Sequence, residues 1–392
     1  LHCISADLPS LACALVEAEQ RLPSRAGAVV LDLSGEQWLA SSAVGTVRAY
    51  AAVPYAMGLW QQLEPRLEAW LQLLQLQELE PLLVPPLPGV DMLLRCLYLA
   101  EALSEQGALT VLLPAPAEAL ALLELARTGP ALLESLLEPL LAWWDQTRQA
   151  LSSLEVVLRL KLPPSASLRL DASWRQRLEQ MAALLAPEAS WQLSLALESP
   201  DPQARLLCQR FSTISLRGFM PSRVGLHGAA AELLVAQRPR WWPKELSATA
   251  LPGSPDLLAL ETFLAQEPCP AHPHFDAEAT VLRLPMPGVD KAQLDVQQIG
   301  AQMVLVCAGQ RRLVTLPQDL QGQGCLGHIV DGFGLRWLVL GIDRRQLQGG
   351  HVATEGTVGG QHELPQQAGG TAGGIELHQP ALTAFVGFGH RQ

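Results

Sequence analysis

Lysine is almost missing from this chain: three lysines occur in 392 residues, and the first of them is Lys161. The N-terminal pattern predicts a short strand (His2–Ile4), a loop (Ser5–Ser10) and a helix (Leu11–Arg21). In an open α/β sheet, ligands bind where such a strand gives way to its helix. A loop that binds nucleotide phosphates there needs glycines for close backbone approach and a lysine for the terminal phosphates. Residues 5–10 contain neither, so this turn lacks the chemistry of a phosphate loop.

The sequence also lacks an excess of basic residues, closely paired cysteines and long apolar runs. These absences limit the cellular compartments and the partners that it suits. The formal net charge is −11, which disfavours nucleic acid and anionic membranes as partners. The seven cysteines are scattered and form no C-x-x-C pair, which is typical of reduced thiols in a cytoplasmic protein. No apolar run reaches the roughly 18 residues of a membrane span, and no basic segment precedes the apolar residues 11–16. We therefore expect neither an integral membrane protein nor a signal peptide.

Strand and helix patterns alternate over the first 236 residues. Short apolar runs predict strands at Ala28–Leu33, Thr110–Leu113, Val156–Leu162 and Trp191–Glu198. Helical spacing predicts helices over Pro65–Leu74, Gly89–Gln106 and Trp174–Leu185, one beginning at Arg205, and two leucine-rich helices split at Gly129-Pro130. This alternation predicts an α/β domain with a doubly wound, mostly parallel sheet over residues 1–236.

The composition changes after residue 236. Residues 237–274 are rich in proline and tryptophan, which predicts a connector with a short helix at Pro255–Gln266. Residues 275–340 hold short strand patterns separated by Pro-Gly and Asp-Gly turns, which is typical of a small antiparallel β-sandwich. Residues 341–392 are rich in Gly and Gln without a sustained apolar period, so we expect a disordered tail.

Three stretches of residues 275–340 carry a family resemblance. They are Leu282-Arg-Leu-Pro-Met-Pro-Gly-Val-Asp-Lys-Ala-Gln-Leu-Asp-Val, the Leu-Pro within Leu313–Leu320, and Asp331-Gly-Phe-Gly-Leu-Arg-Trp-Leu. In this order they resemble the α-crystallin or small-heat-shock domain (HSP20-like). Prolines and glycines in such a sandwich fix the turns between strands that alternate inward and outward.

A second resemblance covers about residues 1–264. It is carried by Leu87-Pro-Gly-Val-Asp-Met-Leu-Leu at a helix start, the strand Thr110–Leu113, the leucine-rich helices of Ala117–Leu141 and Pro200-Asp-Pro-Gln-Ala-Arg-Leu. Together they are similar to the arsenite-pump (ArsA-like) and tail-anchored-protein-targeting ATPase family. Its cyanobacterial and plastid members place an α-crystallin domain after the ATPase, as here. The resemblance implies a P-loop NTPase fold, a homodimer and a hydrophobic groove for client segments.

The departures from that family concern its chemistry. The family's loop is Gly-Lys-Gly-Gly-Val-Gly-Lys-Thr-Thr, and the helix start places Cys3–Ser10 over it. Leu8 then stands near the second lysine, and Pro9, which offers neither an N–H nor a hydroxyl, near the magnesium-binding threonine. Pro114-Ala115-Pro116 occupies the turn that holds the family's sensor aspartate, and Ser222 is the nearest candidate for its adenine-binding asparagine. Phosphoryl transfer therefore has no electrostatic support, which indicates a degenerate Walker A motif.

Ser5, Asp7 and Ser10 are the remaining candidates at this loop. They could form an anion site with the helix N-terminal amides, or Asp7 or Ser10 could cap the helix. Because an aspartate repels phosphate, we favour the cap. Asp32 ends a strand and could bind a metal, but no second carboxylate is suggested nearby, so we expect a loop residue or a helix cap.

Other motifs have competing interpretations. Cys269, His272 and His274 offer only three ligands, whereas a structural zinc takes four, so we predict no metal. The tryptophan pairs Trp143-Trp144 and Trp241-Trp242 fit packing better than client contact. The leucine-rich residues 129–144 fit a client groove and a buried core or dimer surface equally well. Ile375-Glu-Leu377 resembles the I-x-I anchor of small heat-shock proteins, but three residues in a low-complexity tail favour coincidence.

The sequence therefore predicts a non-hydrolysing pseudo-ATPase that acts as a chaperone-like or protein-interaction module, with no catalytic residue, metal or cofactor. Its expected partners are protein clients and a second copy, in the cytoplasm. The alternative is an active ATPase that binds ATP and magnesium through a phosphate loop upstream of Leu1, since the chain does not begin with methionine. A structural scaffold that binds no client is a third hypothesis.

Overall fold

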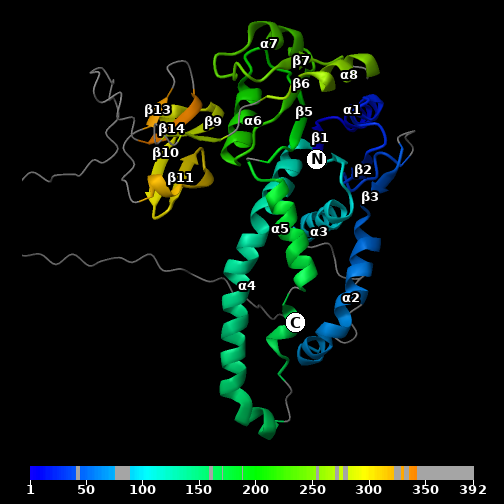
Figure 1. Ribbon diagram of the computed structural model, residues 1–392, viewed down its shortest axis with the longest axis vertical. Helices are drawn as coiled ribbons and strands as arrows, with labels where there is room; N and C mark the ends of the chain where they lie inside the picture. Colours follow the sequence, from blue (N-terminus) through cyan, green and yellow to red (C-terminus); the bar gives the residue numbers. More distant parts are fainter. Residues whose placement is uncertain are drawn as a thin grey trace, which may run out of the picture. The chain divides into compact units, whose positions relative to one another are not determined.

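The computed structural model describes residues 1–40, 45–75, 89–158, 162–169, 171–187, 189–252, 256–269, 273–276, 281–321, 328–330 and 335–341. Its first part is a seven-stranded parallel sheet in the order β3-β2-β4-β1-β5-β6-β7, which confirms the predicted α/β class (Figure 1). The strands are β1 (His2–Ala6), β2 (Val29–Asp32), β3 (Val47–Ala49), β4 (Leu109–Leu112), β5 (Gln192–Glu198), β6 (Arg223–His227) and β7 (Ala248–Ala250). β1 pairs in parallel with β4 and β5, so the first strand lies at the centre of the sheet.

Helices cover both faces of this sheet, which explains why its central strands read as continuous apolar runs. One face packs against α1 (Pro9–Arg21) and α8 (Leu257–Ala265), with Ile4 and Leu112 at the contact. The other face packs against α3 (Val90–Glu105), the first turns of α4 (Pro116–Leu158), α5 (Ala172–Leu184), α6 (Arg205–Leu216) and α7 (Ala231–Gln237). Two apolar cores therefore hold the doubly wound sheet.

Two helices are longer than the sequence predicted. α4 is one continuous helix of 43 residues that contains Pro130 and Pro139, so the predicted split at Gly129-Pro130 is wrong. A proline removes one backbone hydrogen bond, and the leucines, alanines and glutamates around it favour helix. The predicted strand Val156–Leu162 is also wrong, because residues up to Leu158 belong to α4. α2 (Ala52–Leu73) starts before the predicted helix and contains Pro65.

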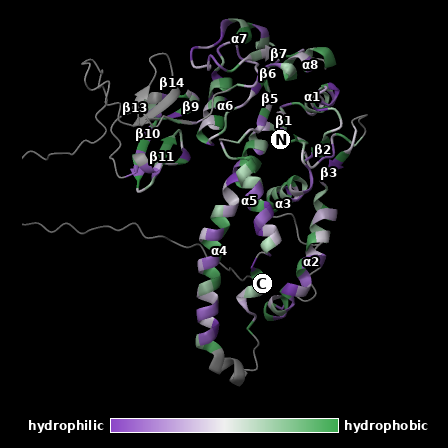
Figure 2. Ribbon diagram, in the orientation of Figure 1, coloured by the Kyte–Doolittle hydropathy of each residue, from purple (hydrophilic) through white to green (hydrophobic). Residues whose placement is uncertain are grey.

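α4 is joined to its neighbours by side-chain contacts outside the sheet. α5 packs along it, and the rings of Trp70 on α2 and Trp144 on α4 have centroids 4.9 Å apart. The indole N–H groups donate to Ser167 Oγ and to the Pro163 carbonyl, at the short 3₁₀ helix η2 (Ser165–Leu168). Figure 2 shows that α4 carries hydrophobic and hydrophilic residues along its described length. Within the described residues, no helix combines the length and apolarity needed to cross a bilayer.

The residues expected to form a connector, 237–274, contribute to the α/β layers. β7 pairs with β6, and α8 packs on α1. Trp242 is buried, and its ring lies 4.8 Å from that of Phe211 on α6, which agrees with the packing interpretation of this tryptophan pair. The predicted helix at Pro255–Gln266 is confirmed as α8. The parallel sheet therefore continues past residue 236.

The C-terminal β domain has two antiparallel sheets, as predicted. One has the order β10-β11-β12 and the other β13-β14-β9-β8. The strands are β8 (His274–Asp276), β9 (Val281–Val289), β10 (Asp295–Ile299), β11 (Gln302–Cys307), β12 (Gln310–Thr315), β13 (His328–Val330) and β14 (Leu335–Gly341), with 3₁₀ helices η3 (Lys291–Gln293) and η4 (Gln318–Leu320). Leu284, Met286 and Leu305 lie in its core. The predicted tail lies outside the described residues, apart from Gly341 at the end of β14.

The Pro-Gly-Val motif joins this β domain to α6. The Ser215 hydroxyl of α6 donates to the Pro287 carbonyl at 2.9 Å, and the Cys208 thiol donates to the Gly288 carbonyl at 3.5 Å. Arg312 of β12 is buried and donates to the Ser215 carbonyl at 2.9 Å. Burial, and to a smaller degree the nearby Arg127, lowers the pKa of Arg312 to about 10. α6 is thus shared by the sheet and the β domain.

Candidate functional site

The three predicted loop residues do not converge on one point. Ser5 lies in β1 rather than in the loop, and its buried hydroxyl donates to the Pro114 carbonyl at 2.5 Å. Ser10 is exposed in the first turn of α1. The N-cap of α1 is Leu8, with no side-chain cap hydrogen bond, so the expectation that Asp7 or Ser10 caps this helix is wrong. Pro9 begins the helix because its fixed φ suits the first turn.

Asp7 is instead held by its own chain at the carboxyl edge of the sheet. Its carboxylate accepts the Glu198 amide at 2.5 Å and forms an ion pair with Arg210 of α6. His227, the last residue of β6, is buried beside this pair, and its Nε2 has no hydrogen-bond partner in the described part of the chain. Burial lowers the pKa of His227, opposed by the negative charges of Asp7 and Glu198. At this edge the Asp7 carboxylate is therefore neutralised by Arg210 of the same chain.

The polar groups in the loops after the neighbouring strands also find hydrogen-bond and ion-pair partners within the chain. The buried Asp32 carboxylate accepts the amides of Ser34 and Leu39 at 2.9 and 3.1 Å, which matches the expected loop role. Arg95 of α3 donates to the Leu33 carbonyl at 3.2 Å and pairs with Asp91 and Glu118. After β4, Pro114 and Ala115 form the turn into α4, and Pro116 is already the first residue of that helix. Asp32 thus organises a loop.

Two other predicted residues lie away from this edge. Ser222 precedes β6, at the opposite, amino-terminal edge, where its hydroxyl accepts the Leu193 amide at 3.1 Å. It therefore lies away from the loop of β1. Cys269 is buried in the main core, His272 lies outside the described residues, and the described chain holds no group of three His, Cys, Asp or Glu side chains that suits a metal.

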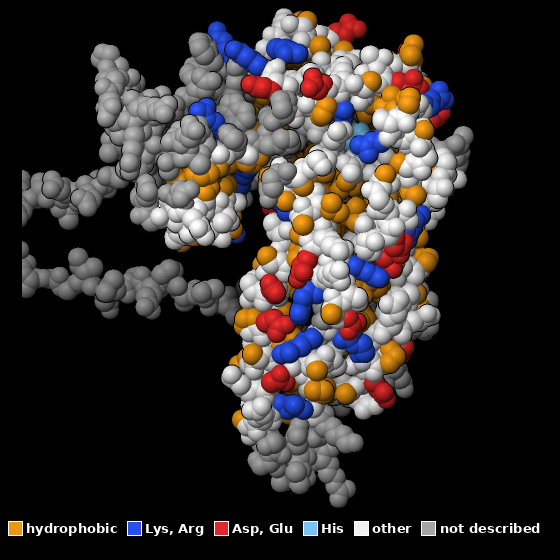
Figure 3. Space-filling view, in the orientation of Figure 1, with side chains coloured by type: hydrophobic (Ala, Val, Ile, Leu, Met, Phe, Trp, Pro, Cys, Tyr) orange, Lys and Arg blue, Asp and Glu red, His pale blue; other side chains and the backbone are white. Residues whose placement is uncertain are grey.

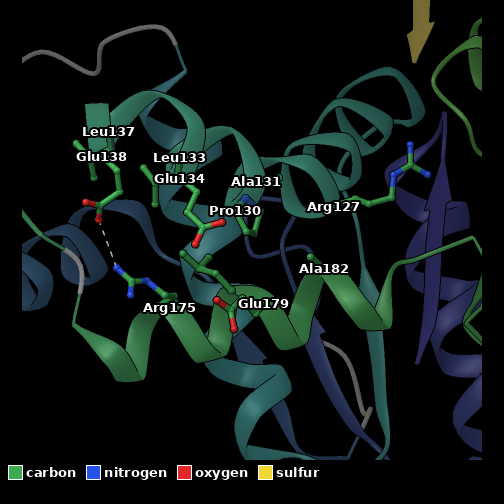
Figure 4. A pocket seen from close by; sticks show the side chains of 11 residues that line it. Arg127, Pro130, Ala131, Leu133, Glu134, Leu137, Glu138, Arg175, Glu179 and Ala182 are labelled. Atoms are coloured by element: carbon green, nitrogen blue, oxygen red, sulfur yellow. Dashed lines mark ion pairs between the residues drawn. The ribbon is translucent and has the colours of Figure 1, made fainter. Parts of the chain in front are cut away.

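A cleft lies between α4 and α5. Its volume is about 380 Å³. It is lined on α4 by Arg127, Pro130, Ala131, Leu133, Glu134, Leu137 and Glu138, and on α5 by Arg175, Leu178, Glu179 and Ala182 (Figure 4). Apolar side chains form most of its wall, and charged side chains rim it. This composition suits an apolar partner with polar ends.

The outer side of α4 near this cleft is unusually apolar. Leu132, Leu136, Leu140 and Trp143 are each more than half exposed, with values of 53%, 63%, 57% and 59%. Trp143 thus differs from the packed Trp144, and the expectation that both members of this pair pack is wrong for Trp143. Figure 3 shows hydrophobic side chains among acidic and basic ones over the helices that extend from the sheet. In this chain the leucine-rich residues 129–144 are therefore partly open to solvent.

Some of the charged side chains at the rim of the cleft form ion pairs, and others do not. Glu138 lies 3.6 Å from Arg175 and 3.7 Å from Arg169. Glu134 and Glu179 project into the space between the helices (Figure 4) and have no ion-pair partner among the described residues. The rim therefore favours positive charge in a partner.

Sequence reasoning missed Arg210, His227 and Glu179. Arg210 stands 203 residues from Asp7, and no local pattern connects them. The sequence held a signal for His227, because this histidine ends an apolar strand and the carboxyl ends of such strands form the ligand edge. Glu179 lies on a helix whose apolar stripe is weak, so its face was not assigned.

Comparison with known proteins identifies the β domain. Residues 277–326 match the family model of the HSP20-like domain found in ArsA. The match supports an ArsA-type C-terminal domain, in agreement with the two antiparallel sheets. No curated protein matches the chain.

Proposed function

We propose that this chain binds apolar helical segments of other proteins in the cleft between α4 and α5, as a chaperone-like module that does not hydrolyse ATP. The observation that carries this proposal is the apolar cleft wall beside the exposed leucines of α4. Large exposed apolar patches mark interaction surfaces. The arrangement favours one occupant, a helix of apolar residues with basic residues near its ends, because Glu134 and Glu179 line the cleft and have no ion-pair partner in the described part of the chain.

The carboxyl edge of the sheet supports the absence of hydrolysis. Asp7 places a negative charge beside the first turn of α1, and Arg210 neutralises it. A phosphate approaching this turn would meet the Asp7 carboxylate and no lysine, and the nearby Arg210 is already paired with that carboxylate. β1 already holds the central position of the sheet, so an upstream phosphate loop would have to act from elsewhere. This favours a degenerate Walker A motif over the active-ATPase alternative.

The β domain and the cysteines bear on the family and the cellular setting of this chain. An ArsA-associated β domain behind a parallel α/β domain favours descent from arsenite-pump-type ATPases of the cyanobacterial or plastid layout. Six of the seven cysteines lie in the described chain, and none of the six is in a disulfide, which supports a reducing, cytoplasmic setting. We propose protein clients, and a second copy of the chain, as partners.

The test measures binding of a fluorescent helical peptide of leucine and alanine with lysines at both ends. The variants Leu133→Ser and Leu137→Ser remove apolar cleft wall, and we expect affinity to fall about tenfold or more for each leucine, from roughly 1.5–3 kcal/mol of lost burial. Leu258→Ser on α8 is the matched control, because Leu258 is 72% exposed and lies outside the cleft. Its affinity should equal that of the wild type.

Charge provides a second arm of this experiment. The same peptide with glutamates at its ends should bind more weakly, and Glu134→Gln with Glu179→Gln should remove that preference. Equal binding by the cleft variants and the wild type would contradict the site. No binding of any apolar peptide would favour a structural scaffold.

A further inference from the structure

A second cavity lies at the amino-terminal edge of the sheet, opposite the loop of β1. Its volume is about 350 Å³. It is lined by the end of α1 and the following turn, by the first residues of β5 and β6, and by α8. Its polar wall contains His2, Glu19, Ser24, Arg25, Gln192 and Arg223. The cavity is independent of the cleft between α4 and α5.

Arg223 is a buried cation whose side chain donates to neutral groups. Its side chain donates from Nε to the Gln266 carbonyl at 2.8 Å and from Nη1 to the Gln192 amide oxygen at 2.9 Å. Both acceptors are neutral, and no carboxylate of the described residues lies within ion-pair distance of Arg223. Burial lowers the pKa of Arg223; the charge of the nearby Glu19 opposes this effect, and the charge of Arg25 makes a smaller contribution that lowers the pKa. Buried charges are normally paired, so an anion bound in the cavity would stabilise the guanidinium group of Arg223.

The one carboxylate of the cavity is shared through one of its oxygens, whereas its buried Oε2 has no hydrogen-bond partner among the described residues. Glu19 Oε1 lies 2.5 Å from His2 Nδ1 and 3.5 Å from Arg25 Nε. Among the cavity residues that are charged at neutral pH, two arginines face one glutamate. One positive charge is therefore in surplus among these three side chains.

The histidine network forms the floor of the cavity rather than a catalytic centre. His2 Nε2 lies 2.8 Å from Ser194 Oγ, so Ser194, His2 and Glu19 follow the order of a hydrolase triad. Ser194 has no exposed surface, however, and sits in the middle of β5. No substrate can reach its hydroxyl, and we assign the three residues a structural role.

We propose that the cavity binds a small oxyanion, a phosphate or carboxylate group, between Arg25 and Arg223. The planar guanidinium fork matches both groups. Arg25 is about a quarter exposed at the rim, with 23% of its side chain accessible, and Arg223 lies deeper. The anion therefore enters past Arg25 and neutralises Arg223, while Gln192 and Ser24 supply neutral hydrogen-bonding groups.

The test titrates sodium phosphate, sulfate and acetate into the full chain by calorimetry, with sodium chloride at equal ionic strength as the reference. We expect saturable binding of at least one oxyanion and a rise in the unfolding temperature with its concentration. Phosphate bound more tightly than acetate would indicate a phosphate-bearing ligand, and the reverse order a carboxylic acid. No saturable binding of any of the three would overturn the proposal.

Variants locate the binding. Arg25→Gln should weaken it about tenfold or more, since a charge-assisted contact is lost. Arg21→Gln is the matched control, because Arg21 is an exposed arginine at the end of α1, four residues before Arg25, that pairs with Glu17 and does not line the cavity. Arg223→Gln should abolish binding, with circular dichroism to verify folding; if it fails to fold, Arg25→Gln decides. Equal affinities for Arg25→Gln and the wild type, or equal losses in Arg25→Gln and Arg21→Gln, would overturn the site.

Discussion

Replacing Gly288 with alanine should loosen the attachment of the β domain to α6. Gly288 has φ +77°, and a Cβ at this position would lie 2.5 Å from the Cys208 carbonyl oxygen and 2.8 Å from the Ser212 amide nitrogen. Both are backbone atoms of α6, so no side-chain rotation relieves the contact. Either the β domain or the helix must move.

The expected magnitude follows from two separate costs. A left-handed backbone costs a residue with a Cβ about 1–2 kcal/mol, and overpacking costs typically about 1–3 kcal/mol more. Gly309 provides a matched control, since it also has φ +77° but a Cβ there would meet no atom within 4 Å. Gly309→Ala should therefore lose about 1–2 kcal/mol of unfolding free energy, and Gly288→Ala about 2–5 kcal/mol.

The assay is urea unfolding of the full chain, followed by circular dichroism and tryptophan fluorescence. Part of the fluorescence comes from Trp241 and Trp242, which pack against Phe211 of α6. The urea concentration at the unfolding midpoint should be highest for the wild type, lower for Gly309→Ala and lowest for Gly288→Ala. Equal losses in the two variants would refute the reasoning, since strain alone would then account for both.

Three further predictions concern the core and the edge of the sheet. Burial, the largest cause, raises the pKa of Cys3 and of Cys96 to about 12. The stability from keeping both thiols protonated is complete below about pH 9 and is lost as pH rises toward 12. The double variant Cys3→Ala, Cys96→Ala should therefore flatten the alkaline fall in urea midpoint, and an unchanged slope would count against this cause. Arg210→Met should cost about 1–3 kcal/mol of unfolding free energy, because it leaves the Asp7 carboxylate without its cation; a double-mutant cycle with Asp7→Asn that shows no coupling would contradict the ion pair. Phe211→Ala should cost about 3–5 kcal/mol, since Phe211 is fully buried, and a loss below about 1 kcal/mol would show that the site collapses around it.

Much of the fold was predictable because its strands are short, apolar and buried on both faces. β1, β4 and β5 each form a continuous buried run, and such runs identify parallel strands. β7 was missed, because Ala248–Ala250 carries no apolar pattern and is a strand only through its pairing with β6. The split of α4 was wrong because Pro130 was treated as a stop, whereas flanking helix propensity and packing against α5 decide the outcome.

The site was less predictable than the fold. The position of Asp7 at the ligand edge followed from the strand-to-helix pattern, but its partner Arg210 is supplied by a distant helix. Likewise, the leucines of α4 gave the apolar character of the cleft, whereas the facing Arg175 and Glu179 come from α5 and depend on tertiary packing. Both the Asp7–Arg210 pair and the cleft between α4 and α5 are formed by residues far apart in the sequence, which local propensity does not bring together.

The proposed independence from ATP can be measured by calorimetric titration of ATP and ADP, with and without magnesium, into protein of verified N-terminus. We expect no heat of binding and no shift in unfolding temperature, because the Asp7 carboxylate, paired with Arg210, lies at the edge beside α1 and residues 5–10 contain no lysine. Magnesium-dependent binding in the micromolar range would contradict it, since the phosphates would then be held by groups that this account leaves out.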